Sequence, residues 1–165
     1  MNPTNFNTMT DEIKQVVHIA QRLAKENMHN TYSPAHLLKA ILHKDFPVLK
    51  KLESLGIDVY YIEEWAEIRI ETYPRSSGMS DSPQPDKDAK AVFDEADNIR
   101  LKINRDVVDL ESLIISCVTP GVGFNYEQLK TLPVTPFILL EKLQSNIPIQ
   151  PAESQENNSV AGNTT

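Results

Sequence analysis

The sequence predicts an all-α fold made of two copies of one helical unit, and three observations predict it. Apolar residues after Thr10 recur at the i, i+3, i+4, i+7 spacing of an amphipathic helix. The same stripe returns in the second half of the chain, after Asp86. A second apolar stripe follows each copy, after Ser33 and after Asp109, at the same offset that separates Thr10 from Asp86. We therefore expect a pseudo-twofold double repeat of about eight helices, four in each half.

The first two helices of each half are the best-matched elements, and all their positions pair at this one repeat offset. In the first helices, the stripe positions pair as Ile13, Val16, Val17, Ala20 and Leu23 with Ala89, Val92, Phe93, Ala96 and Ile99. In the second helices, Leu37, Leu38, Ile41 and Leu42 pair with Leu113, Ile114, Cys117 and Val118. Ser33 and Asp109 precede the second helices, and both are good N-cap residues because their side chains accept a bond from a free N–H of the first turn. Each half thus predicts a long helix, a short loop and a shorter helix.

The third and fourth helices are less alike in the two halves. In the first half, a third helix over 48–55 ends at Gly56, and Asp58 caps a fourth helix that runs from Val59 to about Ile70 and stops near Pro74. In the second half, the corresponding stretch is shorter and contains two prolines. We expect a stunted third helix around 126–132 and a last helix around 136–144.

Two stretches are predicted to lack regular structure. Residues 75–85 are rich in Ser, Pro and Gly, which favours a loop between the halves. Residues 145–165 are polar, without periodicity, and cannot bury enough apolar surface to offset the entropy of ordering. We expect a domain over 1–144 and a flexible linker over 145–165 that leads to a domain outside this chain.

Composition excludes several classes of function. The 165 residues carry a formal net charge of −7 with both signs interspersed, which argues against a nucleic-acid surface. The densest basic spots, Lys50–Lys51 and the group Arg100, Lys102 and Arg105, are interpreted as solvated helix faces. No apolar run approaches the ~20 residues of a membrane span, and no signal peptide is evident. A cytoplasmic location follows by default, in agreement with a single cysteine.

The residue types that carry catalysis do not assemble into a recognisable site. The glycines do not match a phosphate-binding loop, so no nucleotide cofactor is expected in this chain. His36 and His43 are seven apart, interpreted as two turns of one helix, which misses the i, i+4 spacing of a helical zinc pair. Cys117 occupies an apolar stripe position and is interpreted as a small core residue. We predict no enzymatic activity, no metal and no cofactor.

Several motifs resemble the N-terminal domain of the Clp/Hsp100 protein unfoldases. The family's H-L-L-x-A-[IL]-L motif stands here as HLLKAIL at 36–42, and its A-x-x-L-A stretch as AQRLA at 20–24. The segment LESLGIDVYYIEE is similar to the turn between the family's third and fourth helices. The second copy, KDAKAVFDEADNIRLKINRDVVDLESLIISCV, aligns without a gap, and the resemblance covers about 9–143. The loop that begins ETYPRSS is similar to the ClpB disaggregase branch, and the ClpV ATPase of type VI secretion remains an alternative.

The resemblance implies a recognition domain tethered ahead of two ATPase rings. Such a domain binds unfolded or aggregated protein segments, or an amphipathic helix of a secretion-sheath subunit, and hands them to the pore. ATP and hexamer formation would belong to the parent, and we expect the isolated domain to be a monomer. The alternative is a stand-alone adaptor of the same fold that acts in trans, which a gene continuing past residue 165 into an ATPase motif would exclude.

The resemblance also implies a hydrophobic groove between the repeats. Its flanking positions match Thr10 and Glu111, and its apolar wall matches Phe93 and Ile99. Each has a competing structural role: Thr10 as an N-cap, Glu111 as a first-turn carboxylate, and the two apolar residues as core. Two departures concern the same groove. Arg105 stands where ClpB-like members usually carry an acidic residue, and Ser112 replaces a groove leucine, so specificity is expected to differ.

Overall fold

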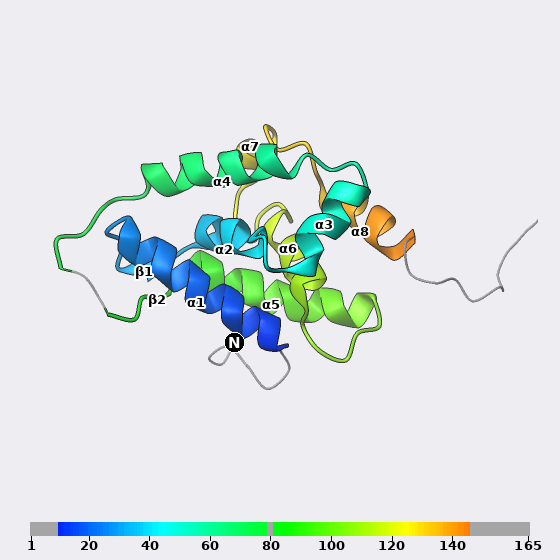
Figure 1. Cartoon of the computed structure of the whole chain (residues 1–165), viewed down its shortest axis with the longest axis horizontal. Coiled ribbons are helices and arrows are strands. Elements are labelled where there is room, and N and C mark those ends of the chain that lie inside the picture. The colour runs from blue at the N-terminus through cyan, green and yellow to red at the C-terminus, as the bar shows by residue number, and fades with distance from the viewer. Residues whose placement is uncertain (1–9, 79–80, 146–165) are drawn as a thin grey trace, which may run out of the picture.

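The computed structural model describes residues 10–78 and 81–145, which form eight helices and one pair of very short strands (Figure 1). The first half contains α1 (Asp11–Glu26), β1 (Thr31–Tyr32), α2 (Pro34–Ile41), α3 (Pro47–Ser54) and α4 (Val59–Thr72). The second half contains β2 (Gln84–Pro85), α5 (Lys87–Lys102), α6 (Leu110–Cys117), α7 (Tyr126–Leu129) and α8 (Pro136–Ser145). The predicted all-α double repeat is confirmed.

The repeat is most regular in the first two helices of each half. Helices α1 and α5 are both 16 residues long, α2 and α6 are both 8 residues long, and both pairs start at the predicted repeat offset. The copies then diverge, because α7 has 4 residues where α3 has 8, and α8 has 10 where α4 has 14. The stunted end predicted for the second half is therefore present.

The turn after each long helix is also repeated, which the apolar pattern did not reveal. Met28 and Asn104 both have positive φ, at 62° and 59°, although neither is glycine. The next residue in each copy reaches back into the helix: His29 N–H donates to Ala24 at 2.8 Å and Arg105 N–H donates to Arg100 at 2.8 Å. These bonds satisfy carbonyls at the helix end and offset the cost of the left-handed residue.

Each half accepts a backbone hydrogen bond from the N-cap residue of the other half's long helix. The N–H of Asp86, the N-cap of α5, donates to the carbonyl of Tyr32 at 2.9 Å. The N–H of Thr10, the N-cap of α1, donates to the carbonyl of Val108 at 3.0 Å. The two donors occupy equivalent repeat positions, and so do the two acceptors, so the bonds are related by the pseudo-twofold. Near the first bond, β1 and β2 pair in parallel, so the end of the predicted 75–85 loop is ordered.

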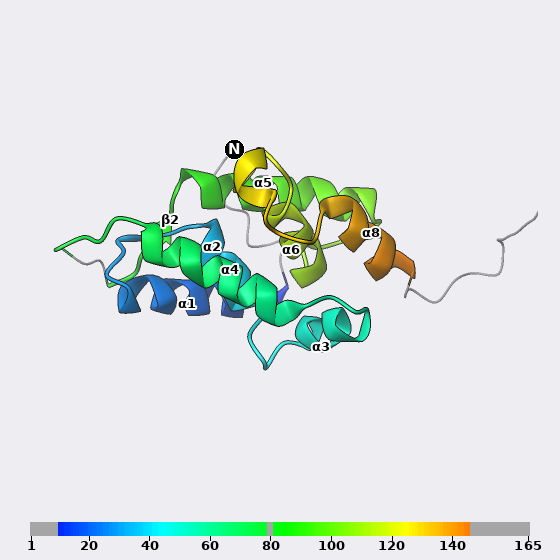
Figure 2. The ribbon, with the colours of Figure 1, turned by 90° about the horizontal axis from the view of Figure 1, so that it is seen from above.

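Helices α2 and α6 form the centre of the molecule. Figures 1 and 2 show them between α4 on one side and α1 and α5 on the other. Helix α2 packs against α1, α4, α5 and α6, and α6 packs against α2, α5 and α8. All residues of α6 except Glu111 are buried, including Cys117, so the predicted core role of this cysteine is confirmed. One continuous apolar core spans both repeats.

Three details refine or limit the sequence predictions. Gly56 follows α3 with φ 85°, as expected of a residue that ends a helix in the left-handed region. His43 lies two residues beyond α2, so the interpretation that it shares a helix with His36 was wrong. The predicted linker over 145–165 lies, apart from Ser145 at the end of α8, outside the described residues.

Candidate functional site

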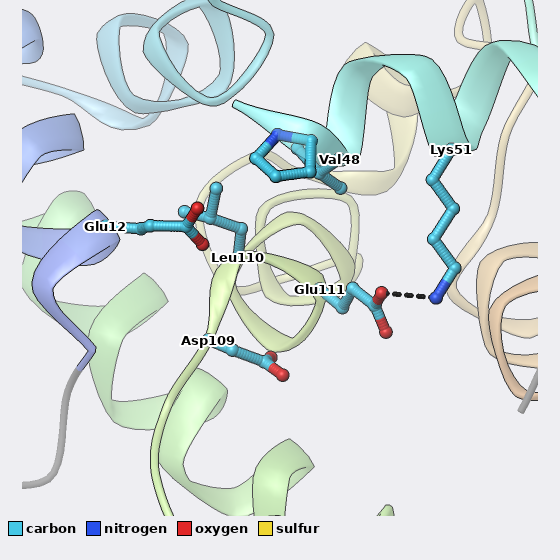
Figure 3. Close-up of a pocket in the computed structure, with 7 residues that line it drawn as sticks. Glu12, Val48, Lys51, Asp109, Leu110 and Glu111 are labelled. Carbon is cyan, nitrogen blue, oxygen red and sulfur yellow. Dashed lines mark hydrogen bonds and ion pairs between the residues drawn. The ribbon is translucent and has the colours of Figure 1, made fainter. Parts of the chain in front are cut away.

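A cavity of about 220 Å³ lies between the two repeats, where the starts of α1, α3 and α6 meet (Figure 3). The first repeat contributes one residue of α1 and three of α3, and the second contributes the start of α6. The lining residues are Glu12, Pro47, Val48, Lys51, Asp109, Leu110 and Glu111. Small-molecule sites span roughly 300–1,000 Å³. The cavity is smaller than this, so it suits one or two side chains of a larger partner.

Two N-caps bring the first turns of α1 and α6 together. The Thr10 hydroxyl accepts from Ile13 N–H at 3.3 Å while the Thr10 N–H bonds the chain just before α6. At the start of α6, Asp109 Oδ1 accepts from Ser112 N–H at 2.9 Å, and Asp109 N–H donates to Ser112 Oγ at 3.0 Å. Ser112, which departs from the family's leucine, is thus a buried half of a capping box.

Glu111 is the centre of an ion-pair network on the cavity rim. Its Oε2 lies 2.6 Å from Lys51 Nζ, and its Oε1 lies 3.0 Å from Arg105 Nη2. Arg105 also pairs with Asp109. Burial alone would lower the pKa of Arg105, but the hydrogen bond to Glu111 and the charge of Asp109 outweigh it and raise this pKa. Arg105 therefore stays charged and holds the two carboxylates in place.

Glu12 is the rim carboxylate that remains available. Across residues 10–78 and 81–145, no cation lies within ion-pair distance of Glu12. Beside it, Val48 and Leu110 are buried apolar residues that line the cavity. The site thus offers an apolar floor, one unpaired carboxylate and two neutralised ones, which is suited to an apolar side chain with a donor or a positive charge beside it.

The residues predicted for the groove fall into two groups. Glu111 lines the cavity, and Thr10 lies at the same end of the molecule, two residues before the lining residue Glu12. Phe93 and Ile99 are 0% and 4% exposed and belong to the core, so in this conformation they offer no open wall. Their part in a groove stays a prediction.

Sequence reasoning missed several ion pairs at and near the cavity rim. Lys51 was interpreted as part of a solvated basic face, yet its ammonium pairs with Glu111, 60 residues away. Arg100 and Arg105, also interpreted as solvated, pair with Asp97 at 2.6 Å and with the rim carboxylates. No spacing rule within one helix predicts a pair between α3 and α6. An unpaired first-turn acid such as Glu12 carries no signal beyond helix stabilisation.

The equivalent position in the other half of the pseudo-twofold has a closely packed glycine. At the repeat offset, Gly123 is the counterpart of the lining residue Pro47, and Pro34 is the counterpart of Leu110. A Cβ on Gly123 would lie 2.9 Å from Pro34 Cβ and 2.7 Å from Val92 Cγ2. The loop before α7 thus packs directly against the start of α2. The helices are equivalent there, but the residues packed between them differ.

Two buried histidines, His29 and His36, form a separate cluster whose hydrogen bonds stabilise the fold. Ser33 N–H donates to His36 Nδ1 at 2.9 Å, which leaves the proton on His36 Nε2 to point at His29 Nδ1, 3.0 Å away. Burial, and then the neighbouring His29, lowers the pKa of His36 to about 3. Burial also lowers the pKa of His29. In the described part of the chain, no group of three His, Cys, Asp or Glu side chains is placed to hold a metal ion.

Comparison with known proteins agrees with the double repeat. The family model described as the Clp repeat (R) N-terminal domain matches residues 8–126. Chaperone protein ClpB 1 from Synechococcus elongatus is 26% identical over 116 residues, which are 70% of this chain and 13% of that protein. The chain therefore spans about an eighth of the length of this relative.

Solved structures share the fold at lower identity. The N-terminal domain of Hsp104 from Candida albicans matches with a TM-score of 0.66 at 15% identity, over 81% of this chain and 87% of that one. A complex of a ClpV N-domain with a VipB peptide matches with a TM-score of 0.52 at 18% identity, over 68% of this chain and 69% of that one. Among the helices that the structure describes, none is both long and apolar enough to cross a membrane.

Proposed function

We propose a function for this chain from one premise: it belongs to the Clp repeat (R) N-terminal domain family. In our proposal it is the recognition domain of a Clp-type ATPase, of the ClpB or ClpV kind. It binds exposed segments of client or adaptor proteins and presents them to the pore of the parent. The chain itself needs no catalytic group for this role.

The observation that carries the proposal is the cavity between the repeats. It combines buried apolar residues, Val48 and Leu110, with the unpaired carboxylate of Glu12. A small apolar hollow with one charge at its rim selects an exposed apolar side chain beside a basic or N–H-donating group. Binding of one or two side chains is weak and releasable, as handover to a translocating pore requires.

The ligand is a protein segment rather than a small molecule. The volume of about 220 Å³ is small, and the site is open to solvent. The related ClpV N-domain has been solved with a VipB peptide, which supports a peptide ligand here. Arg105 and Lys51 neutralise Glu111, so the balance of charge at the rim rests on Glu12. We expect segments with a basic residue next to an apolar one to bind better than acidic segments.

The proposal is tested by titrating this chain into fluorescently labelled, unfolded casein and measuring anisotropy. Glu12→Lys is expected to weaken binding of basic-apolar segments about tenfold, because it reverses the one unpaired rim charge. Glu53→Gln, which removes an exposed carboxylate from the neighbouring α3, is the matched control and should bind as the unaltered chain does. Equal affinity of the Glu12→Lys and unaltered chains would contradict binding at the cavity.

A further inference from the structure

Arg69 on α4 differs from the other partly buried arginines. Arg100 and Arg105 each pair with a carboxylate, at 2.6 and 3.0 Å. Arg69 has no ion pair with any described residue, and its Nε is buried without a hydrogen-bond partner. Its other nitrogens make only two long contacts, Nη1 to Trp65 O at 3.5 Å and Nη2 to Thr131 Oγ1 at 3.4 Å. Most of its five donors are therefore unused.

The guanidinium is nevertheless held in a fixed place. Its central carbon lies 3.8 Å from the centroid of the Trp65 ring, in a cation–π contact. Trp65 is itself fixed, because its Nε1–H donates to Thr131 Oγ1 at 2.8 Å. The hydroxyl of Tyr61 donates to the carbonyl of Thr131 at 2.7 Å. Tyr61, Trp65 and Arg69 of α4 thus all contact Thr131, which lies in the turn after α7.

No carboxylate of the described chain compensates this charge. Glu67, on the same helix, pairs with Lys39, and Glu127, on α7, pairs with Lys130. Burial lowers the pKa of Arg69, and the groups that act in the opposite direction are Tyr73 and Tyr61, neither of which is a carboxylate. A partly desolvated cation without a counterion is unfavourable, and an anion supplied by a partner would relieve the cost.

We propose that Arg69, stacked on Trp65 beside Tyr61, forms a second protein-binding site whose ligand is a carboxylate of an acidic-apolar peptide segment. A guanidinium binds a carboxylate through two parallel hydrogen bonds, and Arg69 has the free donors to make them. Tyr61, 45% exposed, supplies aromatic surface near it on α4, and its hydroxyl donates to the same residue, Thr131, that Arg69 contacts. Trp, Tyr and Arg are the residues most enriched at the energetic centres of protein interfaces.

This site is independent of the cavity between the repeats. It lies on α4 and the turn after α7, whereas the cavity is lined from α1, α3 and α6. The two sites also favour opposite ligands, since the cavity presents the unpaired Glu12 and this one an unpaired arginine.

The sole tryptophan of the chain makes the site directly observable. The probe is an acetylated and amidated pentapeptide of alternating phenylalanine or leucine and glutamate, titrated into the full 165-residue chain. We expect the indole N–H signal of Trp65 to shift and its fluorescence to change with added peptide. The same peptide with glutamine in place of glutamate should leave both unchanged. An equal response to the glutamine peptide would overturn the proposal.

Variants of Arg69 distinguish the paired hydrogen bonds of a guanidinium from the effect of a positive charge alone. Arg69→Gln should weaken binding of the glutamate peptide about tenfold or more, and Arg69→Lys should recover only part of the loss. Arg22→Gln on the exposed face of α1 is the matched control and should bind normally. Binding here is read from the Trp65 signals with the glutamate peptide, and binding at the cavity is read from casein anisotropy, which distinguishes failure here from failure at the cavity. Unchanged binding by Arg69→Gln, or tighter binding of inorganic phosphate than of the peptide, would refute the carboxylate site.

Discussion

At the scale of single residues, buried polar groups decide how the fold responds to pH. His36 is fully buried and accepts the Ser33 N–H, so it must stay neutral. Its pKa is about 3 in the folded chain against an ordinary value of 6.5. The unfolded chain therefore takes up a proton first as the pH falls. The stability due to neutral His36 is complete above pH 6.5 and is lost progressively below it, down to the folded pKa.

This linkage predicts an acid-sensitive fold. At pH 5 the loss due to His36 is about 2 kcal/mol relative to pH 7.5, because pH 5 lies about 1.5 pH units below the ordinary pKa of 6.5 and still above the folded pKa of about 3. Urea unfolding at both pH values measures it. His36→Gln should lower stability at pH 7.5 but flatten the pH dependence, whereas His18→Gln, on the exposed face of α1, should keep the full dependence. Identical pH slopes in the two variants would contradict the assignment.

Gly123 packs closely against α5 and the start of α2, and this predicts that it tolerates no side chain. A Cβ there would meet Val92 and Pro34 at 2.7 and 2.9 Å, and both are buried, so the surrounding packing would have to shift. Gly123→Ala should destabilise the chain by about 1–3 kcal/mol through overpacking. Gly78→Ala, where nothing lies within 4 Å, is the control and should change the melting temperature little. Equal melting temperatures for the two variants would show that the loop is not packed as described.

At the scale of elements, the start of α6 ties the fold to the candidate site. Asp109 caps this helix and pairs with Arg105, which in turn holds Glu111. Asp109→Ala should cost about 0.5–2 kcal/mol of unfolding free energy through the lost cap. Asp109→Asn should recover most of it, because the amide oxygen can still accept the Ser112 N–H. Thermal unfolding of both variants tests the prediction, and equal losses would mean that the Arg105 pair, not the cap, carries the effect.

The elements that sequence reasoning predicted are those whose signals are local. The caps Thr10, Asp58 and Asp109, the stripe of each long helix and the Gly56 stop all depend on residues within one or two turns. The pairing of β1 with β2 was missed, because strands of two residues have no periodicity to detect. The left-handed turns were also missed, because Met28 gives no signal for positive φ.

At the scale of the whole molecule, the two repeats form one structure because each supplies part of the other. The N–H groups of Thr10 and Asp86 are both satisfied by carbonyls of the opposite half. The constant repeat offset predicted this pseudo-twofold but not where it breaks. One difference lies at Gly123, the counterpart of the lining residue Pro47, because the chain there packs closely against Val92 and Pro34. Of the residues predicted for the groove, Glu111 lines the cavity between the repeats, Thr10 lies two residues before its lining residue Glu12, and Phe93 and Ile99 lie in the core.

The most direct measurement is amide chemical-shift mapping of the ¹⁵N-labelled chain during titration with unfolded casein. We predict shifts that cluster at the first turns of α1, α3 and α6, around Glu12, Lys51 and Glu111, with no loss of the folded spectrum. Shifts confined to other surfaces, or none at saturating casein, would contradict recognition through the cavity between the repeats.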